Sequence, residues 1–288
     1  MKQRKKIFIS CLLVFSVFVL LLSCGKGDGV KEASSFDSVD ISYEAVGEGE
    51  PALVFVHGWS CSRAHWNAQK DYFSKKYRVV MLDLAGHGAS GKNRNQWTME
   101  AFGKDVAAVV KKEKLTKVIL IGHSMGGVVV LNAAKELSWS VVGIVGVDNL
   151  HDVEVKLTKE QIEEFVSPFR KDFEGKKESF FKGMFPKGTD PVFIEKAAAG
   201  IKADPDIAVT LLEEFCRTDQ AKLVKETEVP IHLINTDLWP SNVQAGKRQA
   251  GSSFKLTLIK GAGHFPMIEV PEKFNMVLEN VVESFLKQ

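Results

Sequence analysis

One segment indicates the fold more clearly than any other: Val118-Ile119-Leu120-Ile121-Gly122-His123-Ser124-Met125-Gly126-Gly127. Its four apolar residues predict a short buried strand, and the apolar pattern of residues 128–137 predicts a helix, so Ser124 stands at the turn between them. Gly122 and Gly126 lack the Cβ atoms that would collide as strand and helix close on each other. The pattern is typical of a nucleophile elbow, in which a strained turn exposes the serine hydroxyl to substrate.

Three further motifs follow predicted strands elsewhere in the chain. Each comes directly after an apolar or strand-like run, at residues 53–56, 79–82 and 254–259. In chain order, the motifs are His57-Gly58-Trp59, Asp83-Leu84-Ala85-Gly86-His87-Gly88-Ala89-Ser90 and Gly261-Ala262-Gly263-His264-Phe265. Together with the elbow they give the order of an oxyanion loop, a serine and a late histidine.

With these motifs in this order, the chain from about residue 39 to its C-terminus resembles the α/β-hydrolase superfamily. The resemblance implies a mostly parallel central sheet flanked by helices, with ligands bound at the carboxyl ends of the strands. It also implies that Ser124 is the nucleophile and His264 the catalytic base. The backbone N–H groups of Trp59 and Met125 would form the oxyanion hole.

The acid of the triad has two candidates. Most relatives place it after the seventh strand in a Gly-x-x-Asp turn, whereas this chain has Asn235-Thr236-Asp237 with no glycine there. The turn looks like that of haloalkane dehalogenases that carry their acid after the sixth strand, where this chain has Asp148. Asp237 lies at a normal family distance before His264 and remains the alternative, with Asp152 a remote third.

Periodicity divides the chain into a core and a cap. Strands are predicted at residues 39–46, 52–56, 79–82, 118–121, 141–147, 231–235 and 254–259, and helices at 99–113, 126–137 and 271–286. Between the strands at 141–147 and 231–235, which correspond to the sixth and seventh strands of the family, residues 158–225 show only helical patterns and are rich in phenylalanine. We therefore expect a core of residues 39–150 and 226–288 and a helical cap of residues 151–225. Most cap phenylalanines are expected to pack on the core, and some to line a substrate cavity.

The N-terminus has the features of an export signal. Lys2, Arg4, Lys5 and Lys6 precede an apolar run over residues 7–22, which indicates a signal peptide of residues 1–23. The following Leu21-Leu22-Ser23-Cys24-Gly25 resembles a bacterial lipobox, which implies lipidation of Cys24. We expect residues 24–38 to be a lipidated, flexible tether that anchors the protein to a membrane of the bacterial cell envelope.

Composition limits the other classes of function. The net charge is +2, and the four N-terminal cations exceed that total, so nothing indicates a nucleic-acid partner. The histidines show no metal-ligand spacing, and neither a metal nor a cofactor is expected. Cys61 and Cys216 remain after Cys11 and Cys24 are set aside, and the sequence leaves open whether they pair, as it does the oligomeric state.

Serine at the elbow favours attack on an acyl carbon, because the dehalogenases and epoxide hydrolases that resemble this chain carry aspartate there and form alkyl esters. The expected function is hydrolysis of carboxylic esters, small or medium and apolar, through an acyl-enzyme. The same triad supports thioesterase, lactonase, carbon–carbon hydrolase, amidase or perhydrolase activity. A binding protein that kept the fold but lost turnover is the alternative from another class.

Overall fold

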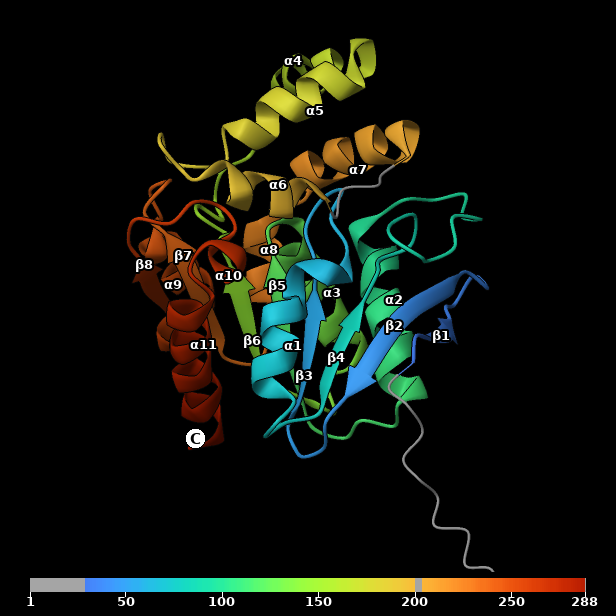
Figure 1. Cartoon of the computed structure of the whole chain (residues 1–288), viewed down its shortest axis with the longest axis vertical. Helices are drawn as coiled ribbons and strands as arrows, with labels where there is room; N and C mark the ends of the chain where they lie inside the picture. Colours follow the sequence, from blue (N-terminus) through green and yellow to red (C-terminus); the bar gives the residue numbers. More distant parts are fainter. Residues whose placement is uncertain (1–28, 200–203, 288) are drawn as a thin grey trace, which may run out of the picture.

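A twisted sheet forms the centre of the molecule (Figure 1). The computed structural model describes residues 29–199 and 204–287, and within them the sheet has eight strands in the order β1-β2-β4-β3-β5-β6-β7-β8. The strands are β1 (Lys31–Ser34), β2 (Asp40–Val46), β3 (Ala52–Val56), β4 (Val79–Leu82), β5 (Val118–His123), β6 (Val141–Val147), β7 (Ile231–Thr236) and β8 (Phe254–Ile259). β2 pairs antiparallel with both of its neighbours, β1 and β4, and the strands β3 to β8 are mutually parallel.

The central strands are apolar along their whole length. Every residue of β3, β4 and β5 is buried, which requires cover on both faces of the sheet. On one face lie α1 (Asn67–Phe73) and α11 (Pro271–Leu286), and on the other lie α2 (Met99–Lys112), α3 (Met125–Glu136), α8 (Gln220–Lys225) and α9 (Val243–Ala250) (Figure 1). The result is the three-layered α/β-hydrolase architecture that the motifs predict.

A group of helices is inserted between β6 and β7. These are α4 (Lys159–Lys171), α5 (Phe173–Lys182), α6 (Pro191–Ala199) and α7 (Pro205–Arg217), followed by α8 against the sheet layer. Figure 1 shows α4 to α7 lying over one end of the sheet. Trp59, in the loop after β3, donates from Nε1 to the Ala208 carbonyl of α7 at 2.7 Å, which ties the inserted helices to the carboxyl ends of the strands.

The first strand differs from the expectation. Residues 31–34 lie in the segment predicted to be a flexible tether, but they form β1, which pairs with β2 in a regular antiparallel register from Lys31↔Tyr43 to Ser34↔Asp40. Ala33 is the only buried residue of this strand, so the sequence of residues 31–34 shows almost no apolar pattern. The strand forms because β2 provides its hydrogen-bonding partner. The tether prediction is therefore wrong for these four residues.

The predicted leader, residues 1–23, and Cys24 lie outside the described residues. Among those described, no helix reaches the length and apolar character needed to cross a bilayer.

Candidate active site

Ser124 stands at a sharp turn between β5 and α3. Its φ of 53° and ψ of −123° belong to a strained conformation that non-glycine residues rarely adopt. A Cβ added to Gly122 would lie 2.3 Å from the Gly126 carbonyl oxygen, and one added to Gly126 would lie 2.6 Å from the His57 carbonyl oxygen. Both positions require glycine, because the displaced atoms belong to backbone. The turn predicted from the sequence is present.

His264 and Asp148 lie in loops that follow two different strands: Asp148 comes directly after β6, and His264 comes shortly after β8. His264 Nδ1 lies 2.6 Å from Asp148 Oδ2, and both side chains are buried. A carboxylate only accepts hydrogen bonds here, so Nδ1 carries the proton and Nε2 is left as a proton acceptor. This is the tautomer that a catalytic base requires.

The Asp148 carboxylate is held by the end of β7. Its Oδ1 accepts from the Thr236 N–H at 2.8 Å and from Thr236 Oγ1 at 3.1 Å. The Asn235 side chain also bonds both backbone groups of Asn149, which fixes the segment that follows Asp148. Burial alone would raise the pKa of Asp148, but the hydrogen bond and charge of His264 outweigh it and keep this pKa below its usual value.

The alternative acids lie elsewhere. Asp237 is exposed, and its Oδ1 accepts from the Gly261 N–H at 2.8 Å, so it closes the turn before the histidine loop and does not bind the imidazole. Asp152 caps its own turn through the Glu154 N–H at 3.1 Å and binds the Asn242 amide at 2.9 Å. Of the three aspartates, Asp148 alone binds His264.

The backbone around His264 is fixed by a carboxylate that sequence reasoning missed. Glu269 accepts from the N–H groups on either side of the histidine, Gly263 at 2.8 Å and Phe265 at 3.2 Å. The His264 N–H donates to the Met184 carbonyl at 2.8 Å. The sequence could have indicated Glu269, because it lies only five residues after His264; in the structure it ends the short helix α10 (Pro266–Glu269).

A second histidine that the motifs did not reveal lies beside the same acid. His151 Nε2 is 3.8 Å from Asp148 Oδ1 and has no hydrogen-bond partner among the described residues. Ser241 Oγ accepts from Asn235 at 3.0 Å and is also hydrogen-bonded to His151 Nδ1 at 3.0 Å, in a direction set by the imidazole tautomer. Burial lowers the pKa of His151, so it is neutral near pH 7.

The loop after β3 lies directly against the serine. A Cβ added to Gly58 would be 2.9 Å from Ser124 Cβ, so the following Trp59 N–H is at the elbow. Within the described residues, the backbone N–H groups of Trp59 and Met125 have no hydrogen-bond acceptor. Met125 also begins α3, where the helix dipole favours negative charge.

Two further histidines, His57 and His123, hold the backbone around Ser124 and His264 through hydrogen bonds. His57 donates from Nδ1 to the Gly58 carbonyl at 2.8 Å and accepts the Leu84 N–H at Nε2 at 3.0 Å. His123 donates from Nε2 to the His264 carbonyl at 2.8 Å. Burial lowers the pKa of both imidazoles well below the usual value, so both stay neutral and structural.

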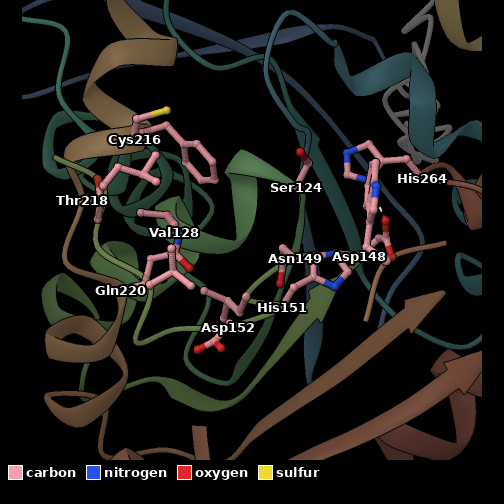
Figure 2. A pocket seen from close by; sticks show the side chains of 15 residues that line it. Ser124, Val128, Asp148, Asn149, His151, Asp152, Cys216, Thr218, Gln220 and His264 are labelled. Atoms are coloured by element: carbon pink, nitrogen blue, oxygen red, sulfur yellow. Dashed lines mark hydrogen bonds and ion pairs between the residues drawn. The ribbon is translucent and has the colours of Figure 1, made fainter. Parts of the chain in front are cut away.

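Two cavities meet at Ser124 and His264, and both residues line each of them. The larger, about 380 Å³, is bounded by the segment after β6 and by the ends of α7 and α8, and Figure 2 shows its labelled lining residues. The smaller, about 50 Å³, lies beside Trp59 and Met125. Cys61 and Cys216 are free thiols, one in each cavity wall. The described residues contain no cluster of three or more His, Cys, Asp or Glu side chains placed to hold a metal.

Comparison with known proteins gives matches of two kinds. A bifunctional esterase/perhydrolase of Acinetobacter calcoaceticus is 40% identical over 93 residues, which are 32% of this chain and 34% of that protein. A non-heme chloroperoxidase of Burkholderia pyrrocinia is 39% identical over 94 residues, again 32% of this chain and 34% of that protein. The matched stretch therefore spans about a third of the length of these curated relatives.

A solved structure and a family model cover far more of the chain. The structure of a thermophilic esterase from Thermogutta terrifontis superposes with a TM-score of 0.77 over 89% of this chain and 99% of that one, at 21% identity, and this likeness shows the fold. The family model described as "Alpha/beta hydrolase family" matches residues 53–277. The chain therefore belongs to the α/β hydrolase family, within which it is similar to esterases and haloperoxidases.

Proposed function

We propose that this protein is a serine hydrolase that cleaves carboxylic esters of small molecules through an acyl-enzyme. The observation that carries the proposal is the 2.6 Å hydrogen bond between His264 Nδ1 and Asp148 Oδ2, formed beside a serine in a strained elbow. A serine hydroxyl needs a neutral imidazole with a free nitrogen, and this bond leaves His264 Nε2 free. In the proposal Ser124 is the nucleophile, His264 the base and Asp148 the residue that orients it.

In the acylation half of the proposed reaction, Ser124 Oγ attacks the ester carbonyl carbon and its proton passes to His264 Nε2. The new imidazolium is stabilised by the Asp148 carboxylate, and the carbonyl oxygen takes up negative charge against the N–H groups of Trp59 and Met125. When the tetrahedral adduct collapses, the bond to the alkoxy oxygen breaks and His264 returns the proton to it. The alcohol leaves, and the acyl group remains on Ser124.

Deacylation repeats these steps with water as the nucleophile. His264 Nε2 takes a proton from water, the resulting hydroxide attacks the acyl carbon, and the proton then passes to Ser124 Oγ as the bond to it breaks. The products are a carboxylic acid and the regenerated serine. Both half-reactions use the same side chains and backbone groups of this chain, with the ester and water as the reactants.

The test is a substrate panel with the full-length protein. We expect 4-nitrophenyl acetate and alkyl acetates to be turned over, and matched amides to react at least about 1,000-fold more slowly because their leaving group is poorer. Acetyl thioesters, lactones, carbon–carbon substrates and peracid formation from acetate and hydrogen peroxide are measured alongside. A kcat/KM for any of these above that for esters would replace the ester assignment. Absence of both turnover and fluorophosphonate labelling would indicate a binding protein.

We also propose that the protein is exported and anchored to a membrane of the bacterial cell envelope through lipid on Cys24. The basic leader, the apolar run of residues 7–22 and the lipobox-like sequence that ends at Cys24 support this. Mass spectrometry of the membrane-extracted protein is expected to find Cys24 as the N-terminal residue carrying diacylglycerol, and a Cys24→Ser variant is expected to keep its leader. An unmodified Cys24 in the native protein contradicts the proposal.

A further inference from the structure

The two cavities at Ser124 differ strongly in size. An ester whose carbonyl carbon lies at this serine would place its acyl chain in one cavity and its alcohol in the other. The volumes are about 380 Å³ and about 50 Å³. An ester has two substituents on its reacting centre, the acyl chain and the alcohol. If the proposed function holds, the site therefore selects esters whose two halves differ in size.

The smaller cavity is lined by aromatic side chains that are held in place. Trp59 is fixed by its hydrogen bond to Ala208 O and by edge-on contacts with the rings of Phe169, Phe173 and Phe180, at centroid distances of 5.6, 6.2 and 5.8 Å. On the other side, Phe265 is stacked between Phe181 at 5.5 Å and Phe185 at 5.6 Å. Interlocked rings of this kind resist expansion, because moving one requires moving its neighbours.

The volume of this cavity sets a limit on what fits. At about 50 Å³ against about 380 Å³, this cavity offers much less space than the larger one, so it admits only the smaller of the ester's two substituents. Apart from His123, Ser124 and His264, the lining side chains are apolar or sulfur-bearing: Trp59, Cys61, Met125, Phe180, Phe181, Met184, Leu212, Phe215 and Phe265. The group that fits is a short, uncharged alkyl chain.

The larger cavity is of a different kind. Its wall includes side chains that also reach solvent, namely Val155 (56% exposed), Leu157 (39%) and Trp239 (37%). Apolar side chains such as Val128, Leu150 and Phe215 form much of the rest of this wall, and Thr218 and Gln220 lie at the end remote from His264 (Figure 2). At about 380 Å³ it lies within the range of cavities that bind whole small-molecule ligands, about 300–1,000 Å³.

The order of product release decides which half of the ester goes where. In acyl-enzyme chemistry the alcohol leaves first, while the acyl group still occupies the serine. The alcohol therefore needs a path to solvent, and the larger cavity, whose wall includes exposed side chains, provides a wider one than the smaller cavity, whose wall is mostly buried. We propose that this protein is selective for esters whose acyl group is short and whose alcohol is larger and mostly apolar.

A pair of isomeric esters tests the proposal directly. Octyl acetate and ethyl octanoate contain the same atoms and leave as primary alcohols of similar acidity, but they exchange the long chain between the two sides of the carbonyl. With the full-length protein and acid release followed by titration, octyl acetate is expected to have a kcat/KM about 100-fold higher or more, since each methylene that does not fit costs severalfold. Equal rates, or preference for ethyl octanoate, overturn the proposal.

Matched variants locate the selectivity in the wall. Phe180 lines the small cavity and Phe173 does not, although both are half-buried cap residues with edge contacts to Trp59. Phe180→Ala is expected to raise the ethyl octanoate rate relative to octyl acetate by about 10-fold, while Phe173→Ala leaves the ratio within about 3-fold. Equal shifts in both variants contradict the assignment. Failure to hydrolyse even 4-nitrophenyl acetate would instead reject the proposed function.

Discussion

Replacing Ser124 by alanine is expected to lower kcat/KM for 4-nitrophenyl acetate by about 10⁵-fold or more, because it removes the proposed nucleophile and burial raises the pKa of the two thiols in the cavity walls, Cys61 and Cys216. The substitution removes one oxygen and leaves the elbow glycines, the His264–Asp148 bond and the oxyanion loop in place. Residual hydrolysis then reflects binding and the backbone N–H groups alone. Labelling by a fluorophosphonate probe is expected to disappear completely.

Ser140→Ala is the matched control, since Ser140 lies just before β6, away from the site, and its hydroxyl donates to the Leu137 carbonyl. This variant is expected to keep full activity and labelling. Thermal unfolding of both variants, followed by circular dichroism, separates a catalytic loss from a folding defect. An active, labelled Ser124→Ala protein with a native melting curve would show that another residue is the nucleophile.

The second large effect is expected for Asp148→Asn, with a loss of about 10⁴-fold in kcat. The asparagine oxygen can still accept from Thr236, so the amide N–H₂ would face His264 Nδ1. An amide donor there favours the tautomer protonated on Nε2, which has no lone pair for the serine proton. The predicted loss is therefore one of protonation state rather than of packing.

Asp237→Asn is the companion variant, and its kcat is expected to stay within about 3-fold of wild type. Its side-chain oxygen keeps the capacity to accept from the Gly261 N–H, which is the contact that Asp237 makes. Comparable losses in both variants would contradict the assignment of the acid. A large loss confined to Asp237→Asn would exchange the two roles.

The sequence predicted the local parts of this site and not the contacts between distant segments. Ser124 and His264 follow from short motifs after predicted strands, because a turn that needs glycines leaves a direct trace in the sequence. The partner of His264 could be Asp148, which follows β6, or Asp237, which follows β7, and the outcome depends on which of the two carboxylates points towards the imidazole. That choice is made by Thr236 and by the φ of 45° at Asp148, and neither is visible in composition or periodicity.

In the cap, too, the sequence predicted the local structure but not the contacts between distant segments. Residues 158–225 were predicted to be helical and contain α4 to α8, but helical spacing does not separate rings in the core from rings that line a cavity. Phe169 is fully buried in the core, whereas Phe180, Phe181 and Phe215 face the cavities. Strand β1 was missed for a related reason, since an edge strand with one buried residue is defined by its partner.

The hydrogen bond from the His264 N–H to the Met184 carbonyl has a consequence for protein engineering. Met184 lies in the turn after α5, so the inserted helices supply an acceptor to the buried main chain of the base. A chimaera that receives a foreign cap without a carbonyl at this point would leave that donor unsatisfied and free the imidazole to shift. Recombination among esterases of this family should therefore transplant residues 181–186 together with the histidine loop, as one inherited block.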